Sequence, residues 1–231
     1  MKIFMVILLY AYSTQLVGQS FFDEADRFFK QFVENGLVKY DQVKKDRSAL
    51  DNLVNKIGAF DLDGASAVEQ KAFLINAYNI LVIHHVVANY PAEGPLKIDG
   101  FFNELKAHVA GTDLTLDELE KKRLYRTFPD ERLHFVLVCA AVGCPPLADF
   151  AFRPDGLEKQ LSDRTTYVLN FPTFIRVTKN IVQISKIFEW YEGDFLVKSE
   201  SVLSYIDQYH TQNLIGKKML YYEYDWMLNK Y

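Results

Sequence analysis

The sequence predicts one α+β domain in which a central, mainly antiparallel sheet packs against helices. Apolar residues make up 49% of the 231 residues, which is enough for a sizeable core in a chain of single-domain length. Apolar residues recur at helical spacing in residues 20–60 and 67–88, whereas residues 132–140 and 174–184 carry the alternation and turn signals of strands. Charged residues, at 24%, form no block, which argues against a disordered chain.

The first nineteen residues predict a signal peptide. Lys2 supplies a positive start, residues 3–9 are apolar, and small residues follow near Gly18. The apolar run is too short for a stable membrane-spanning helix. We therefore expect a secreted or periplasmic mature chain, residues 20–231, without an integral membrane segment. The alternative is that residues 1–19 are not cleaved and remain as an N-terminal anchor.

The charge of the chain bears on its partners. The net charge is −4, and it becomes −5 on removal of residues 1–19, which carry one lysine and no acidic residue. There is no basic stripe and no nucleic-acid motif. Because a mildly acidic domain lacks the attraction that drives binding to a phosphate backbone, we expect no nucleic-acid partner.

Residues 20–60 form the helical N-terminal part of the predicted domain, and residues 66–231 form its α+β core. Phenylalanines at helical spacing predict the first helix. We expect this helix to end at Asn35-Gly36, because glycine suits a left-handed C-cap. Asp41 then begins a second helix.

A long helix is predicted over residues 67–88. Ser66 and Glu69 form a capping box that starts it, and its surface is apolar nearly all round, which predicts a central position. Asn76 and Asn79 lie one turn apart on one side. A buried amide without a partner costs about 1–3 kcal/mol. We expect the pair to satisfy the backbone of a loop, with orientation of a substrate or a histidine as the functional alternative.

The rest of the chain alternates between strands and helices. Residues 132–140 (RLHFVLVCA) are apolar on both faces, which is typical of an interior strand. Residues 174–177 and 180–184 predict a hairpin, and residues 218–224 predict a last strand. Further helices are expected within residues 113–126, 154–169, 185–191 and 201–209.

The two cysteines of the chain, Cys139 and Cys144, follow shortly after His134. A thiolate is the reactive form of cysteine, and it needs a base, a cation or a helix N-terminus beside it. His134 is the candidate base. A carboxylate or an amide then orients the imidazole, as in the triads of cysteine hydrolases. The candidates for this third role are Glu120, Asn76 and Asn79.

Strand geometry limits this site. Five residues of extended chain separate His134 from Cys139 by about 16 Å, at ~3.3 Å per residue, and turn them to opposite faces. A hydrogen bond requires ~3 Å. Cys139 can therefore pair with His134 only if the strand ends early and bends, whereas Cys144 lies past a loop and can double back.

The same residues also have structural interpretations. Two cysteines in an exported protein are typical of a disulfide, and a cysteine or histidine in an apolar strand is typical of a core side chain. Two thiols and one histidine match no common zinc spacing. We therefore expect no metal and no cofactor.

At this point the sequence resembles the DUF547 family, and the resemblance spans nearly the whole mature chain. The Asn-Ala-Tyr-Asn segment, followed by the His–Cys–Cys-Pro segment, is its most specific part. The matching segments are GLVKYDQV (36–43), FLINAYNILVI (73–83), LDELE (116–120), HFVLVCAAVGCPPL (134–147), ISKIFEWYEGDF (184–195) and YDWMLN (224–229).

The resemblance implies an α+β domain similar to papain-like thiol hydrolases, with a Glu–His–Cys triad. Transferred to this sequence, the triad is Glu120, His134 and Cys139; relatives of the plant type have Ser where Cys144 stands. Strand geometry conflicts with Cys139, so both cysteines stay candidates. Lys121 follows the glutamate here, where many relatives show His or Asn. The resemblance implies no substrate.

These observations leave three functional hypotheses. The first is a thiol-dependent hydrolase or acyl transferase that acts on a peptide or a related amide or ester. The second is a non-catalytic binding module of the cell envelope with an aromatic groove and a structural disulfide. The third is redox sensing through a reversible disulfide. The expected substrate-binding residues are Asn76, Tyr78, Asn79, Trp190, Tyr191 and Asp194.

Overall fold

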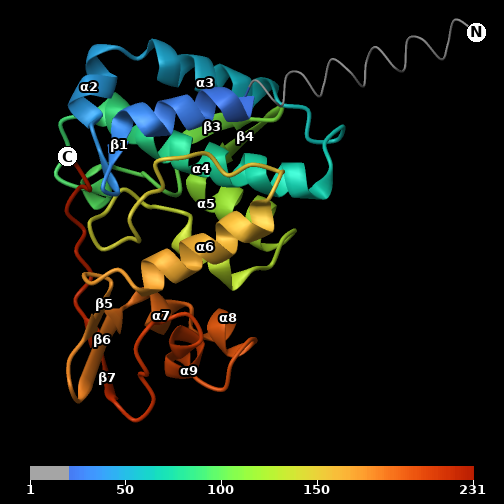
Figure 1. The fold of residues 1–231 in the computed structure, drawn as a ribbon. Helices are drawn as coiled ribbons and strands as arrows, with labels where there is room; N and C mark the ends of the chain where they lie inside the picture. Colours follow the sequence, from blue (N-terminus) through green and yellow to red (C-terminus); the bar gives the residue numbers. More distant parts are fainter. Residues whose placement is uncertain (1–20) are drawn as a thin grey trace, which may run out of the picture.

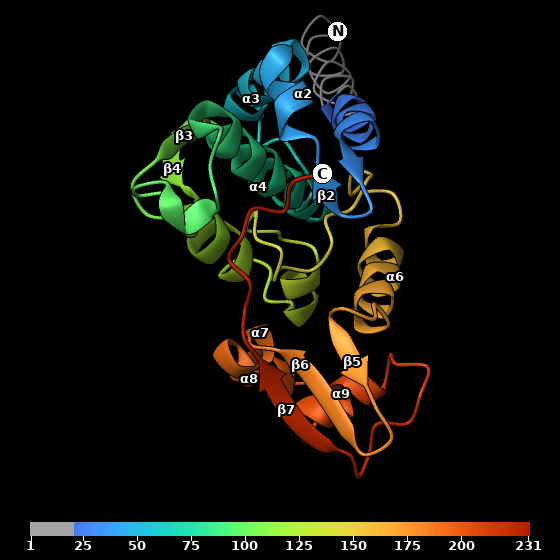
Figure 2. The same cartoon turned by 90° about the vertical axis from the view of Figure 1, so that its left-hand side faces the viewer.

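The computed structural model describes residues 21–231 and folds them into two lobes (Figures 1 and 2). The predicted signal peptide, residues 1–19, lies outside the described residues. One hydrophobic cluster is built from residues 21–161 together with Leu228, and the other from residues 168–214 together with Phe135. The predicted α+β class is confirmed. That residues 20–231 form one domain stays a prediction.

The N-terminal part is helical, as predicted, but its first helix ends earlier than Asn35-Gly36. Residues 21–32 are helical, and Asn35 and Gly36, with φ of 53° and 82°, then form the two-residue turn of a small hairpin. The predicted C-cap is therefore wrong: both residues do adopt the left-handed region, but in a turn between strands. The elements that follow the first helix are β1 (Val33–Glu34), β2 (Leu37–Val38), α2 (Tyr40–Lys45) and α3 (Ser48–Ala59).

The long central helix is confirmed as α4 (Ala67–Asn89), with the Ser66 side chain accepting a hydrogen bond from the Glu69 N–H at its start. This helix is long and apolar enough to cross a membrane, but 83% of its most apolar window is buried inside the protein. Such burial is typical of the core helix of a globular domain.

A hairpin that the sequence did not predict precedes the helical segment containing Glu120. It pairs β3 (Lys106–Val109) with β4 (Thr112–Thr115). Thr115 then caps α5 (Leu116–Glu118), which continues as a π-helical segment, η2 (Leu119–Tyr125). A short 3₁₀ turn, η1 (Pro95–Lys97), lies between α4 and this hairpin.

The predicted interior strand at residues 132–140 is wrong, and so is the predicted central sheet. The segment begins as a 3₁₀ helix, η3 (Glu131–Phe135), and continues without regular structure. The described residues form three small sheets of two, two and three strands. The segment is apolar on both faces because neighbours surround it, and burial on all sides carries no information about backbone conformation.

The second lobe follows the prediction more closely. The predicted hairpin is confirmed as β5 and β6, and the last strand, β7, pairs parallel to β6. From β7 the chain returns to the first lobe, where Leu228 pairs with Ala141 and Lys230 with Val38 (Figure 2). The elements are α6 (Leu157–Leu169), β5 (Ile175–Val177), β6 (Ile181–Ser185), α7 (Ile187–Trp190), α8 (Glu192–Leu196), α9 (Val202–Asp207) and β7 (Lys218–Tyr222).

Candidate active site

A cavity of about 420 Å³ lies between the two lobes and collects all four predicted catalytic residues. Its walls come from α4, η2, η3, the cysteine segment, α7 and the C-terminal segment. The predicted residues that line it are Tyr78, Glu120, His134, Cys139, Cys144, Trp190 and Tyr191. Side chains more than a hundred positions apart therefore meet in one place, which is the arrangement expected of a binding or catalytic cleft.

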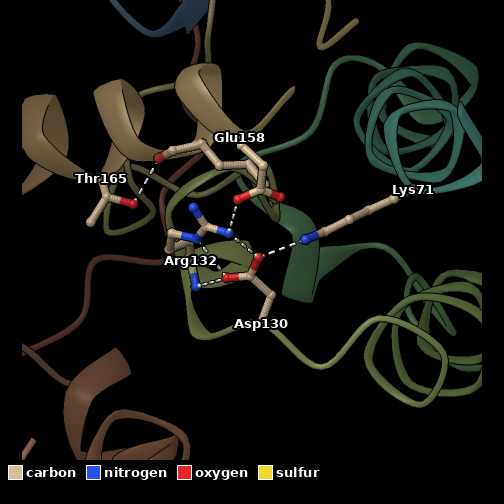
Figure 3. Close-up of polar contacts among 6 residues, drawn as sticks. Lys71, Asp130, Arg132, Glu158 and Thr165 are labelled. Carbon is tan, nitrogen blue, oxygen red and sulfur yellow. Dashed lines mark hydrogen bonds and ion pairs between the residues drawn. The ribbon is translucent and has the colours of Figure 1, made fainter. Parts of the chain in front are cut away.

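A network of charges fixes the 3₁₀ helix that carries His134 (Figure 3). Asp130 caps η3 and lies between Lys71 of α4, at 2.6 Å, and Arg132, at 2.7 Å. Arg132 also reaches Glu158 of α6, at 2.7 Å. Although burial raises it, the hydrogen bonds from Arg132 and Lys71 lower the pKa of Asp130 to about 2. Ion pairs with α4 and α6 thus fix the position of the 3₁₀ helix that carries His134.

The imidazole of His134 is buried and held at both nitrogens. Nδ1 lies 2.8 Å from the Tyr125 hydroxyl, and Nε2 lies 2.8 Å from Oδ2 of Asp194. The ring also lies against Tyr191, with centroids 4.2 Å apart. Burial lowers the pKa of His134, although Asp194 acts in the opposite direction. A lowered pKa favours the neutral form of the imidazole, which is the form able to accept a proton.

Glu120 lies in the same cavity but is hydrogen-bonded to another residue. Its carboxylate accepts a hydrogen bond from the hydroxyl of Tyr78, and burial raises the pKa of Glu120. The resemblance assigns Glu120 the task of orienting His134, whereas the carboxylate in contact with His134 is Asp194. Asp194 was predicted as a substrate-binding residue. Because it lies 60 positions after His134, no local sequence pattern indicated that the two side chains are in contact.

Asn76 and Asn79 do not line the cavity, because both amides are bonded to buried backbone. Asn76 donates to the Phe152 carbonyl at 2.7 Å and accepts from the Phe152 N–H at 2.9 Å. Asn79 donates to the Val136 carbonyl at 2.8 Å and accepts from the Val138 N–H at 3.0 Å. These contacts match the structural role expected for the pair, with Asn79 holding the chain between His134 and Cys139, and a role in substrate binding stays a prediction.

The two cysteines form a disulfide, with their Cα atoms 6.4 Å apart. The backbone N–H of Cys139 and the hydroxyl of Tyr224 each lie 3.0 Å from Sγ of Cys144, and the same hydroxyl lies 3.2 Å from Sγ of Cys139. Burial raises the pKa of Tyr224, so its hydroxyl stays protonated and donates. Tyr224 was not a predicted site residue; the YDWMLN segment, part of the resemblance, was the available signal.

Aromatic side chains close one side of the cavity. Trp190, Tyr224 and Trp226 form a cluster: the two tryptophan ring centroids lie 5.0 Å and 4.7 Å from that of Tyr224 and 6.1 Å from each other. Trp190 is 47% exposed although it is large and apolar. An exposed aromatic wall of this kind offers stacking surface to a ligand. Among residues 21–231, no group of three or more His, Cys, Asp or Glu side chains is placed to hold a metal ion.

A protein-family model matches the part of the chain that carries Glu120, His134 and the two cysteines. The family model described as "Protein of unknown function, DUF547" matches residues 62–168. This part of the chain belongs to the DUF547 family. The DUF547 match includes Glu120, His134 and both cysteines, whereas Asp194 and Tyr224 lie beyond it. Searches of curated proteins and of solved structures gave no match, so the papain-like fold stays a prediction.

Proposed function

We propose that the protein, when its two cysteines are reduced, is a thiol-dependent hydrolase or acyl transferase that acts on a peptide or another amide or ester. The observation that supports this proposal is the convergence of Cys139, His134 and Glu120 on one cleft, with a second carboxylate, Asp194, in contact with His134. Cys139 is the proposed nucleophile because it is the more exposed of the two residues, Cys144 being 7% exposed.

The proposed reaction has two steps. The Cys139 thiolate adds to the substrate carbonyl, the bond to the amine or alcohol breaks, and this leaving group takes the proton that His134 accepted from the thiol. Water, or an acceptor amine or alcohol, then attacks the thioester and releases the acyl group. His134 accepts a proton from this attacking group and returns it to the departing Cys139 sulfur, so the thiol and the neutral imidazole are restored at the end.

His134 has to change one partner for this role. In the disulfide form Nδ1 faces Tyr125 and Nε2 faces Asp194. We propose that reduction lets Nδ1 exchange the Tyr125 hydroxyl for the Cys139 thiol, while Asp194 keeps its hold on Nε2.

Thiol labelling tests the nucleophile. In the reduced mature chain, we expect iodoacetamide to label Cys139 well below pH ~8.5, the ordinary pKa of a thiol. His134→Ala should remove this early labelling, and His210→Ala, which changes a partly exposed histidine that does not line the cavity, should not. Hydrolysis of p-nitrophenyl acetate should disappear in Cys139→Ala and persist in Cys144→Ala. Turnover retained in both Cys139→Ala and His134→Ala would reject the proposal.

The roles of Asp194 and Glu120 can be distinguished by their effects on the pKa of His134. We expect Asp194→Asn to lower the pKa of the imidazole further, because Asp194 raises it, and to move the acidic limb of the pH–rate profile to lower pH. Glu120→Gln should leave that limb in place, since Glu120 is bonded to Tyr78. The opposite pattern would return the orienting role to Glu120, as the resemblance implies.

A second candidate is a non-catalytic binding module, and the disulfide favours it because it leaves no free cysteine in the described chain. The aromatic wall then binds a peptide or a glycan by stacking. Thiol titration of the exported protein separates the two: two thiols that react only after unfolding and reduction support the module. Export itself, through residues 1–19, is part of both proposals.

A further inference from the structure

The two sulfurs of the Cys139–Cys144 disulfide differ in access. Both cysteines line the cavity between the lobes, but Cys139 is partly exposed whereas Cys144 is buried, at 7% exposure. A thiol that enters the cavity therefore reaches Cys139 more easily. Thiol–disulfide exchange proceeds by attack of a thiolate on one sulfur, and access decides which sulfur is attacked.

The same two sulfurs differ in their hydrogen-bond donors. Sγ of Cys144 has two donors at 3.0 Å, the backbone N–H of Cys139 and the Tyr224 hydroxyl, whereas Sγ of Cys139 shares that hydroxyl at the longer distance of 3.2 Å. Trp190 and Trp226 both pack against the Tyr224 ring, with centroids 5.0 Å and 4.7 Å from it. Donors aimed at a sulfur stabilise a negative charge on it, and a sulfur that carries negative charge more readily leaves faster in exchange. Access thus favours Cys139 as the attacked sulfur, and the donors favour Cys144 as the leaving sulfur.

We propose that this disulfide is redox-active, with Cys139 as the sulfur attacked by an incoming low-molecular-weight thiol and Cys144 as the leaving thiolate, held by the Cys139 N–H and the Tyr224 hydroxyl. In the first step, a bond forms between the incoming sulfur and Cys139, the disulfide breaks, and its electron pair stays on Cys144. A second thiol then attacks the mixed disulfide. Two external thiols are oxidised to their disulfide, and their two protons end on the protein thiols.

This activity does not depend on hydrolysis, because exchange needs no acyl substrate. It supplies the free Cys139 thiol on which the proposed hydrolase relies, so the redox state of the pair also decides whether that site is available. The two proposals can fail separately: exchange without ester turnover leaves the redox proposal intact.

The test uses the oxidised mature chain and reduced glutathione at pH 7. Samples are quenched with N-ethylmaleimide at intervals, and the peptide that contains both cysteines is fragmented in a mass spectrometer. We expect glutathione on Cys139 and N-ethylmaleimide on Cys144 in the early samples. Glutathione on Cys144, or equally on both, overturns the assignment. A disulfide that survives glutathione and dithiothreitol until the protein is unfolded overturns the redox proposal as a whole.

A matched pair of variants tests the donor. Tyr224→Phe keeps the ring and removes the hydroxyl, and we expect it to slow exchange with glutathione about tenfold. Tyr222→Phe is the control, because its hydroxyl donates to the Phe174 carbonyl at 3.1 Å rather than to a sulfur; its rate should equal that of the wild type. Equal rates in all three proteins remove Tyr224 from the proposal. The mass-spectrometric assignment in the wild type needs no variant and stands independently of their folding.

Discussion

Helix α4 and the segment from residue 131 to residue 144 are both largely apolar and largely buried, yet α4 is regular throughout whereas the segment is regular only in η3. Helix α4 bonds its own backbone, so its conformation needs little from its neighbours. The 131–144 segment has its backbone bonded from outside, by Asn79 and by the C-terminal segment. The comparison teaches that the site lies where the chain depends on tertiary contacts, since only such contacts can aim His134 and Cys139 at one cavity.

The largest expected loss of stability comes from removing the side-chain hydrogen bonds by which Asn79 of α4 holds the second segment. Asn79→Ala leaves the Val136 carbonyl and the Val138 N–H buried without partners, and we expect a loss of about 2–5 kcal/mol in the free energy of unfolding. Urea denaturation measures it. Asn89→Ala is the control on the same helix: its amide bonds only the His85 carbonyl near the helix end, and we expect a loss below about 1 kcal/mol. Equal losses would show that the segment does not depend on α4.

A smaller effect is expected where the cysteine segment meets the C-terminal segment. A Cβ on Gly143 would lie 2.9 Å from the Asp225 nitrogen and 3.0 Å from Cδ1 of Tyr224. Gly143→Ala should therefore lower the free energy of unfolding by about 1–3 kcal/mol and disturb the contact of Tyr224 with the sulfurs. Gly193→Ala, in α8, has open space around its Cβ and serves as the control. A tolerated Gly143→Ala would mean that the C-terminal segment holds the cysteines only loosely.

The smallest expected effect on stability is a dependence on pH that arises from Asp130. The pKa of Asp130 is lowered to about 2, so its contribution to stability is present above the unfolded-state pKa, near 4, and is lost as the pH falls from about 4 to about 2. With allowance for solvent screening, we expect about 1–2 kcal/mol. Asp130→Asn should flatten this part of the stability curve. Asp163→Asn, in an exposed ion pair of α6, should not. Parallel curves for wild type and Asp130→Asn would contradict the anchoring of η3.

Prediction from the sequence succeeded where local signals set the structure. The capping residue and continuous apolar surface of α4, and the turn between β5 and β6, are such signals, and both elements form as expected. It failed at residues 132–140, because apolar residues on every face do not distinguish a strand from an irregular segment wrapped by neighbours. The β3–β4 hairpin was missed as well.

The candidate site divides in the same way. The sequence by itself determined which groups are available for chemistry: one histidine, two thiols and several carboxylates in segments that resemble DUF547. Tertiary structure decided which of them meet. Asp194 reaches His134 across 60 positions, and Tyr224 reaches the two sulfurs across 80 and more, because the second lobe and the returning C-terminal segment fold against the first lobe. Contacts at such separations are made by packing, which no local pattern records.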